Sequence, residues 1–284
     1  MKASKRRKPA AKPRKPVNAR RRRAKPRQAE PDSVGTSIER IDGEPWVRLA
    51  GGPELAQWSK EEEIRYNQGN RQTEKLLFFR RVFDFLNDNE IRGDYHEFGC
   101  HRVRTLRMAL TEARRHQLGD MKFWAFDSFA GLPDPTSAPS VGIWKQGALT
   151  TSEETLLDLV RRHGVYVDRV HTVPGFYADS LTPELRRRFA AAEAPIALAT
   201  IDCDLYESAV PVFDFIDPLL QPGSALYIDD LFAGYRGAPT AGVARAFLEY
   251  QQRSAWKFVR HLDVGWWGRS YIAYKPAAGL DGVL

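Results

Sequence analysis

Two apolar runs in the second half of the chain each end in a pair of carboxylates. Residues 195–201 (PIALATI) lead into residues 202–204 (Asp-Cys-Asp), and residues 224–228 (SALYI) lead into Asp229 and Asp230. Ligands of an open parallel sheet bind outside the carboxyl ends of its strands, so we expect all four carboxylates at one crevice. Such a cluster repels itself unless a cation or protons neutralise it, and all-oxygen ligands suit a hard cation such as Mg2+.

The order of elements along the chain predicts an α/β fold. Strand-like apolar runs alternate with helix-like segments, which is typical of a doubly wound sheet. Within this alternating part of the chain, helix starts are expected at Thr151 with Glu154 and at Thr182-Pro183. We therefore expect a mostly parallel seven-stranded sheet with helices on both faces. The expected strands are 95–98, 122–126, 169–173, 195–201, 224–228, 256–259 and 271–274, the last two as an antiparallel pair; further helices are expected at 102–117, 207–220 and 239–252.

Composition divides the chain into four parts. Residues 1–32 are rich in Lys, Arg, Pro and Ala and are expected to be disordered, because they have almost nothing to bury. Residues 33–92 are expected to form a connector followed by helices. The main domain is expected over residues 93–276, with a short tail at 277–284. No internal repeat is apparent.

The connector is expected to lead into two helices. Ser59 with Glu62 forms a capping-box pattern that starts the first helix, and apolar residues at helical spacing predict a second helix over residues 73–89. The apolar residues are expected to pack onto the sheet. The N-terminal helices are also candidates for a lid over the site, to which Trp58, Tyr66 and Asn67 could contribute.

The basic character of the protein belongs to its N-terminal tail. Residues 1–27 hold fourteen of the 43 Lys and Arg residues and no acidic residue, so the rest of the chain carries 29 basic against 36 acidic residues. The tail is either an arm that contacts nucleic acid or an anionic surface without specificity, or a solubilising extension. The two cysteines, the lack of a secretory signal and the lack of a membrane span favour a cytoplasmic protein.

The first strand-to-helix turn has features of a nucleoside-cofactor site. Gly99 allows the backbone to approach a ligand closely, and the following helix N-terminus favours the negatively charged end of a cofactor. Asp127, at the end of the second strand, is placed to accept hydrogen bonds from ribose hydroxyls. Glu97 is either part of this site or a buried acid satisfied by backbone N–H groups.

Four motifs, taken in order, resemble the macrocin O-methyltransferase family. The resemblance extends over about residues 60–275 and implies a class I, Rossmann-like methyltransferase domain. It also implies an enzyme that depends on S-adenosylmethionine and Mg2+ and methylates a sugar hydroxyl. The motifs are Glu97-x-Gly99, residues 126–133 (FDSFAGLP), residues 202–208 (DCDLYES) and residues 227–230 (YIDD).

The same resemblance implies roles for particular residues. Six would hold S-adenosylmethionine: Glu97, Gly99 and Thr105 at the methionine end and nearby ribose, Asp127 at the ribose hydroxyls, and Ser128 and Phe129 beside the adenine. Asp202, Asp229 and Asp230 would hold Mg2+, and Asp204 would be the general base. The chain departs from the family pattern at Val103-Arg104, where small residues are usual. Arg102 or Arg104 could pair with the cofactor carboxylate instead.

Several alternatives stay open. Asp204 is expected as the base, as the N-cap of the next helix, or as both. Trp266-Trp267 either stacks on a sugar face or packs in the core. The acceptor is expected to be a small molecule or glycan, but the tail could instead recruit RNA, the ribosome or an anionic glycan. A third hypothesis is a degenerate fold that only binds. A homo-oligomer is compatible with all three.

Overall fold

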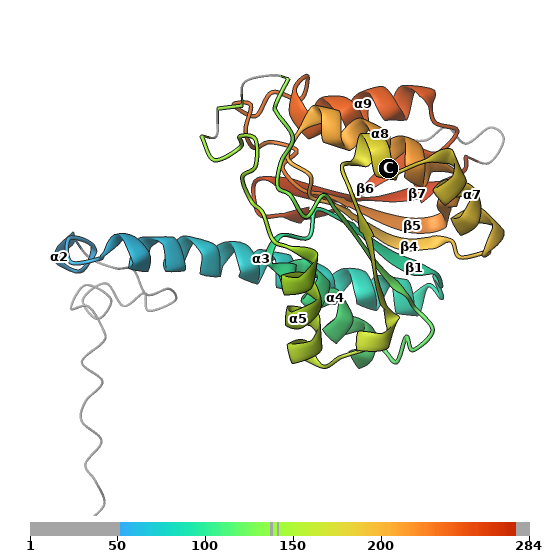
Figure 1. Cartoon of the computed structure of the whole chain (residues 1–284), viewed down its shortest axis with the longest axis horizontal. Coiled ribbons are helices and arrows are strands. Elements are labelled where there is room, and N and C mark those ends of the chain that lie inside the picture. The colour runs from blue at the N-terminus through green and yellow to red at the C-terminus, as the bar shows by residue number, and fades with distance from the viewer. Residues whose placement is uncertain (1–51, 137–138, 141, 277–284) are drawn as a thin grey trace, which may run out of the picture. The chain divides into compact units, whose positions relative to one another are not determined.

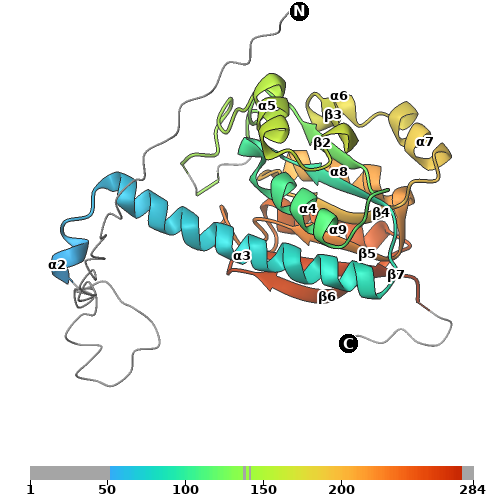
Figure 2. The same cartoon turned by 90° about the horizontal axis from the view of Figure 1, so that it is seen from below.

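The computed structural model describes residues 52–136, 139–140 and 142–276 (Figures 1 and 2). The helices are α2 (Gly52–Leu55), α3 (Lys60–Asp88), α4 (Arg104–Arg115), α5 (Glu153–His163), α6 (Tyr177–Ser180), α7 (Pro183–Ala191), α8 (Tyr206–Ile216) and α9 (Gly242–Arg253). The strands are β1 (Asp94–Phe98), β2 (Phe123–Asp127), β3 (Val170–Pro174), β4 (Ile196–Ile201), β5 (Leu220–Ile228), β6 (Lys257–Val264) and β7 (Gly268–Tyr274). Short 3-10 turns lie at His101–Val103, Val167–Arg169 and Asp217–Leu219.

The seven strands form one sheet in the order β3-β2-β1-β4-β5-β7-β6. Strands β1 to β5 pair in parallel, and β7 is antiparallel to both β5 and β6. The predicted doubly wound sheet with an antiparallel last pair is therefore confirmed. Strands β2 and β3 are added on one side of β1, and β4 and β5 on the other, so the strand order reverses between β1 and β4. A crevice for ligands is expected at such a switch point.

Each face of the sheet carries its own hydrophobic core. Helices α3, α4 and α5 cover one face, and α7, α8 and α9 cover the other (Figure 1). Strands β1 and β4 are buried along their whole length, because helices lie over both of their faces. This double burial explains the continuous apolar run at residues 195–201, since a strand with one wet face would alternate.

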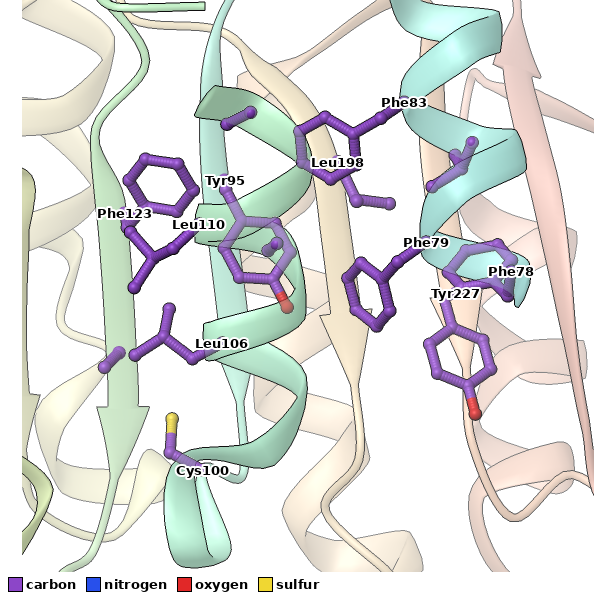
Figure 3. Close-up of a cluster of buried hydrophobic side chains, with 14 of the residues drawn as sticks. Phe78, Phe79, Phe83, Tyr95, Cys100, Leu106, Leu110, Phe123, Leu198 and Tyr227 are labelled. Atoms are coloured by element: carbon purple, nitrogen blue, oxygen red, sulfur yellow. The ribbon is translucent and has the colours of Figure 1, made fainter. Parts of the chain in front are cut away.

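Helix α3 is a single element of 29 residues, so the expectation of two N-terminal helices is wrong. Its second half packs Phe78, Phe79 and Phe83 onto the sheet, with Phe78 against Tyr227 and Phe79 against Tyr95 (Figure 3). Burial of each large apolar side chain contributes roughly 1.5–3 kcal/mol. The polar first half extends from this anchored half, because adding residues to an existing helix is easier than nucleating a new one.

Two of the expected N-caps differ from the prediction. Thr182 caps α7 as expected, with its side chain accepting from the N–H of Leu185 at 3.1 Å. Helix α5 is capped by Ser152, which accepts from the N–H of Thr155 at 3.2 Å, and not by Thr151. Helix α8 begins after Leu205 with no side-chain cap, so Asp204 is not its N-cap.

Several expectations lie outside the described residues. These are the disorder of residues 1–32, the first part of the connector at residues 33–51 and the tail at residues 277–284. Within the described part of the chain, no helix combines the length and apolarity that a membrane span requires. The sheet and all side chains of the site described below belong to the compact unit that begins at Glu62.

Candidate active site

One cavity of about 710 Å³ opens at the carboxyl ends of the central strands. Eight of the ten residues predicted for the site line it: Gly99, Thr105, Asp127, Ser128, Asp202, Asp204, Asp229 and Asp230. The two exceptions are Glu97 and Phe129, which are not among the lining residues. The end of the sheet that was expected to bind a nucleoside and the acidic centre therefore face the same space.

Asp127 organises the turn after β2. One of its carboxylate oxygens accepts from the N–H of Cys100 and the other from the N–H of Phe129, each at 2.8 Å. Ser128 donates its hydroxyl to the carbonyl of Gly131 at 2.7 Å, which closes the same turn. Burial raises the pKa of Asp127, although the two N–H groups oppose this shift. Each carboxylate oxygen has two lone pairs, so both can accept a further hydrogen bond from a ligand in the cavity.

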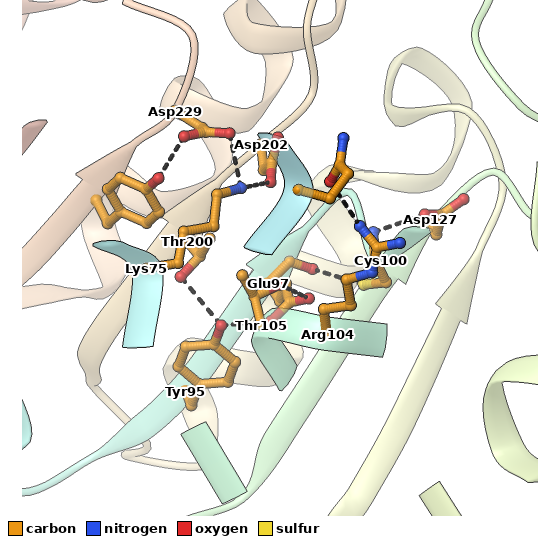
Figure 4. A network of polar contacts seen from close by, with 12 residues as sticks. Lys75, Tyr95, Glu97, Cys100, Arg104, Thr105, Asp127, Thr200, Asp202 and Asp229 are labelled. Atoms are coloured by element: carbon orange, nitrogen blue, oxygen red, sulfur yellow. Dashed lines mark hydrogen bonds and ion pairs between the residues drawn. The ribbon is translucent and has the colours of Figure 1, made fainter. Parts of the chain in front are cut away.

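Glu97 lies beneath the cavity and is fully buried. The hydroxyls of Tyr95 and Thr105 donate to its two oxygens, the second at 2.7 Å (Figure 4). Burial raises its pKa to about 7. Glu97 is therefore a buried acid, as one of the two readings expected, but side-chain hydroxyls satisfy it where backbone N–H groups were expected. Its contribution to the site is to fix Thr105, which does line the cavity.

The first loop has an unusual backbone. Arg102 and Val103 adopt left-handed conformations, with φ of 55° and 58°. This conformation is costly for a β-branched residue, and Val103 is also fully buried. The loop turns Arg104 toward the cavity, where its guanidinium donates to Gln68 at 3.1 Å. Burial, and then the charges of Arg102 and Arg107, lower the pKa of Arg104, so a bound anion would be favoured there.

A lysine from α3 occupies the acidic centre. The Lys75 ammonium donates to Asp202 and to Asp229, each at 2.8 Å (Figure 4). Asp229 also accepts from the hydroxyl of Tyr227 through its other oxygen. Lys75 was not predicted. The available signal was its place on the apolar stripe of the helix, one turn before Phe79 and two before Val82.

Of the three carboxylates that the resemblance implied for Mg2+, Asp202 and Asp230 converge, and Asp204 is the third member of the convergent group. Oxygens of Asp202, Asp204 and Asp230 lie within 4.8 Å of one another, whereas Asp229 is engaged by Lys75. Asp204 and Asp230 both have left-handed backbones, with φ of 62° and 56°. Strained backbone of this kind clusters at functional sites.

Burial sets the protonation of this group. Burial, together with the neighbouring carboxylates, raises the pKa of Asp204 and of Asp230 well above its usual range. Burial and the charge of Asp229 raise the pKa of Asp202 to about 7. Burial acts in the same direction on Asp229, but the Lys75 ammonium, together with the hydrogen bonds from Tyr227 and Asp202, outweighs burial and lowers the pKa of that carboxyl. The ammonium therefore stabilises one carboxylate in its charged form, while the other three still need a cation or protons.

The rim of the cavity combines aromatic and polar groups. Trp266 lines the cavity and is 65% exposed, whereas Trp267 is buried and packs in the core, which is one of the two alternatives expected for the pair. The guanidinium of Arg71 lies 4.7 Å from the Trp267 ring. Gln72 also lines the cavity, and its amide oxygen is buried without a hydrogen-bond partner. A buried acceptor of this kind costs free energy until a donor, such as a ligand hydroxyl, satisfies it.

The chain matches one protein family over most of its described part. A model of the Macrocin-O-methyltransferase (TylF) family matches residues 69–257, more than half of the chain. Over 147 residues the chain is 28% identical to the 8-demethyl-8-(2,3-dimethoxy-alpha-L-rhamnosyl)-tetracenomycin-C 4'-O-methyltransferase of Streptomyces olivaceus, covering 49% of this chain and 53% of that protein. Over 162 residues it is 26% identical to the demethyldecarbamoylnovobiocin O-methyltransferase of Streptomyces niveus, covering 55% and 59%. The chain thus spans somewhat over half the length of the curated relatives it matches.

Solved structures share the fold. The O-methyltransferase NovP aligns with a TM-score of 0.56 at 24% identity, over 70% of this chain and 79% of that chain. CalS11, a calicheamicin methyltransferase, aligns with a TM-score of 0.54 at 20% identity, over 85% of this chain and 87% of that chain. These similarities establish a common architecture for the sheet and its helices.

Proposed function

The chain belongs to the macrocin O-methyltransferase family, and we propose that it is an S-adenosylmethionine-dependent O-methyltransferase. Its proposed acceptor is a hydroxyl of a sugar or of another small molecule or glycan. The observation that carries the proposal is the shared cavity. Asp127, at the end of β2, and the carboxylates at the ends of β4 and β5 all line it. A methyl donor and a hydroxyl acceptor bound at these two places would face each other.

The residues of the first two strand ends fit the cofactor. Asp127 retains acceptor capacity on both oxygens and would take the ribose hydroxyls. Gly99, Thr105 and Ser128 line the adjoining wall, and Phe129 follows in the same turn. We assign the methionine carboxylate to Arg104, which lines this end of the cavity. When bound, S-adenosylmethionine supplies an electrophilic methyl group.

The acidic centre fits a divalent cation. Asp202, Asp204 and Asp230 offer three convergent hard oxygen donors, the type that Mg2+ prefers. The sequence resemblance implied Asp229 in this set, in the position that Asp204 takes here. When bound, the ion supplies a positive charge that lowers the pKa of a coordinated hydroxyl. Mg2+ dependence is therefore part of the proposal, with Asp202 and Asp230 common to both ligand sets.

Asp204 is proposed as the general base. It is buried at the cavity and its strained backbone directs the carboxylate into the acidic group. It would take the proton that the acceptor hydroxyl loses during methyl transfer. One oxygen can contribute to the cation site while the other accepts the proton, since each has separate lone pairs.

Two groups from other elements would position the acceptor. The unpartnered amide oxygen of Gln72 can accept a hydrogen bond from a hydroxyl of the acceptor. The exposed ring of Trp266 at the rim offers a flat apolar surface for a sugar face. Both features suit an acceptor that is polyhydroxylated, with less polar faces between its hydroxyls.

Calorimetry with S-adenosylhomocysteine is the direct test of the cofactor site. The wild-type chain should bind it, and Asp127→Asn should weaken binding by about tenfold or more, because a hydrogen bond to a charged group contributes roughly 1.5–3 kcal/mol. Asp134→Asn, an exposed carboxylate outside the cavity lining, is the matched control and should leave binding unchanged. No binding at millimolar concentration would favour a fold that only binds other partners.

A screen of sugar-bearing metabolites and glycans, with mass detection of one added methyl group, then tests the activity. Deletion of residues 1–32 should leave turnover of a small acceptor intact. A large loss of turnover on deletion would instead favour a macromolecular acceptor that the tail recruits.

A further inference from the structure

Lys75 is held at a fixed position in the acidic centre. It lies on α3 directly before the half that is anchored by buried Phe78, Phe79 and Val82. Its side chain is only 11% exposed, and it reaches carboxylates that are 127 and 154 residues away in sequence. A salt bridge this buried is favourable only when its partners are well placed, so the anchored helix is what makes it feasible.

Lys75 contacts two of the four carboxylates, Asp202 and Asp229. Each oxygen of Asp229 already has a protein partner, one the Lys75 ammonium and the other the Tyr227 hydroxyl. Asp202 uses only one oxygen for Lys75. Its carboxylate also belongs to the convergent group with Asp204 and Asp230. Asp202 is therefore shared between the ammonium and that group, whereas Asp229 serves the ammonium.

We propose that Lys75 is a built-in cation of this centre, which holds Asp229 out of the coordination sphere of a divalent ion. The ion is then bound by Asp202, Asp204 and Asp230, and Lys75 acts as a positioning residue that selects this ligand set. The inference rests on the proposed function for one point, that a divalent ion binds in the acidic centre beside the Lys75 ammonium.

The physical reason is competition for the same oxygens. An ammonium and a divalent ion cannot both lie between Asp202 and Asp229, because the two cations repel at that distance. The Lys75 ammonium spans that gap with hydrogen bonds of 2.8 Å on either side. Removal of the ammonium should make Asp229 available as a ligand. The effect of Asp229→Asn on metal binding should therefore depend on whether Lys75 is present.

Mn2+ titration monitored by electron paramagnetic resonance tests this dependence on the full chain without any turnover assay. The variants are Asp230→Asn, Asp229→Asn, Lys75→Met and the double variant Lys75→Met with Asp229→Asn. Lys257→Met, an exposed lysine on β6, is the matched control. Thermal unfolding of each variant confirms that it is folded before its affinity is compared.

The expected pattern is a coupling between Lys75 and Asp229. Asp230→Asn should weaken Mn2+ binding by about tenfold or more, as loss of a group at a metal site does. Asp229→Asn should weaken Mn2+ binding much less than Asp230→Asn does, because with Lys75 present it removes a neighbouring charge and no ligand. In the Lys75→Met background, Asp229→Asn should cost about tenfold or more, because Asp229 has become a ligand.

Two results would overturn the inference. One is a loss in Asp229→Asn that equals the loss in Asp230→Asn with Lys75 present. The other is an Asp229→Asn effect that is the same in both backgrounds. If the wild-type chain binds no Mn2+, the proposed metal dependence fails separately. In that case a gain of Mn2+ binding in Lys75→Met supports Lys75 as the built-in cation, and no gain rejects it.

Discussion

A Cβ atom placed on Gly99 would lie 1.8 Å from the carbonyl oxygen of Asp202. Gly99 has a φ of +90°, and the N–H of Asp202 donates to the carbonyl of Phe98 at 2.9 Å. The ends of β1 and β4 are therefore in backbone-to-backbone contact at this point. Glycine was expected here for the approach of a ligand, but the neighbouring strand requires it first, and the contact sets the position of Asp202.

Gly99→Ala should therefore destabilise the protein and displace Asp202. Combined overpacking and backbone strain should lower the free energy of unfolding by about 2–4 kcal/mol, measured in urea. Gly69→Ala is the matched control, because Gly69 lies in α3 with open space around it. That change should stabilise the protein by about 0.5–1 kcal/mol through helix propensity. Equal effects of the two substitutions would contradict the contact.

Arg104→Met should weaken binding of S-adenosylhomocysteine by about tenfold or more, because a charge-assisted hydrogen bond to its carboxylate is lost. Binding of 5'-methylthioadenosine, which lacks the amino-acid end, should change by about twofold or less. Calorimetry with both ligands separates a carboxylate contact from a general disturbance of the loop. Parallel losses for the two ligands would show that Arg104 supports the loop and does not bind the carboxylate.

His96 should make the protein less stable as the pH falls. It is fully buried among phenylalanine rings, and burial lowers its pKa from 6.5 to about 3. Between these two values the unfolded chain binds a proton that the folded chain does not, so the free energy of unfolding decreases with falling pH. The slope is about 1.4 kcal/mol per pH unit.

His96→Leu should remove this contribution from the pH dependence. Urea unfolding at pH 7 and at pH 5 measures the loss of stability, and the loss should be smaller in the variant by about 2 kcal/mol. Buried acids with raised pKa, such as Glu97, act in the opposite direction in both proteins, so they cancel in the comparison. An unchanged difference between the two pH values would mean that His96 is protonated inside the fold.

Asp204→Asn should lower kcat by about 10²- to 10⁴-fold with an identified acceptor, because the group that takes the proton is lost. Affinity for S-adenosylhomocysteine should stay within about twofold, since Asp204 belongs to the acidic end of the cavity. Single-turnover kinetics with saturating cofactor is the appropriate measurement. Retention of most of the rate would remove Asp204 as the base and leave it as a cation ligand only.

Much of the fold could be predicted from local pattern. The apolar run before Asp202 is that of a strand buried on both faces, and Thr182-Pro183 begins a helix through contacts within its own first turn. Local signals were less reliable where several polar residues compete. Ser152 and not Thr151 caps α5, and no side chain caps α8, because cap geometry depends on a backbone conformation that composition does not specify.

The sequence by itself determined the order of strands and helices and the placing of carboxylates at two strand ends, because both follow from local periodicity. The tertiary structure alone decided what those carboxylates do. Lys75 pairs with Asp202 and Asp229 across the fold, and the buried Glu97 serves Thr105 beneath the cavity. The Lys75 pairings depend on how α3, which is distant in sequence, is anchored against the sheet. Burial then determines which carboxylates need a neutralising partner.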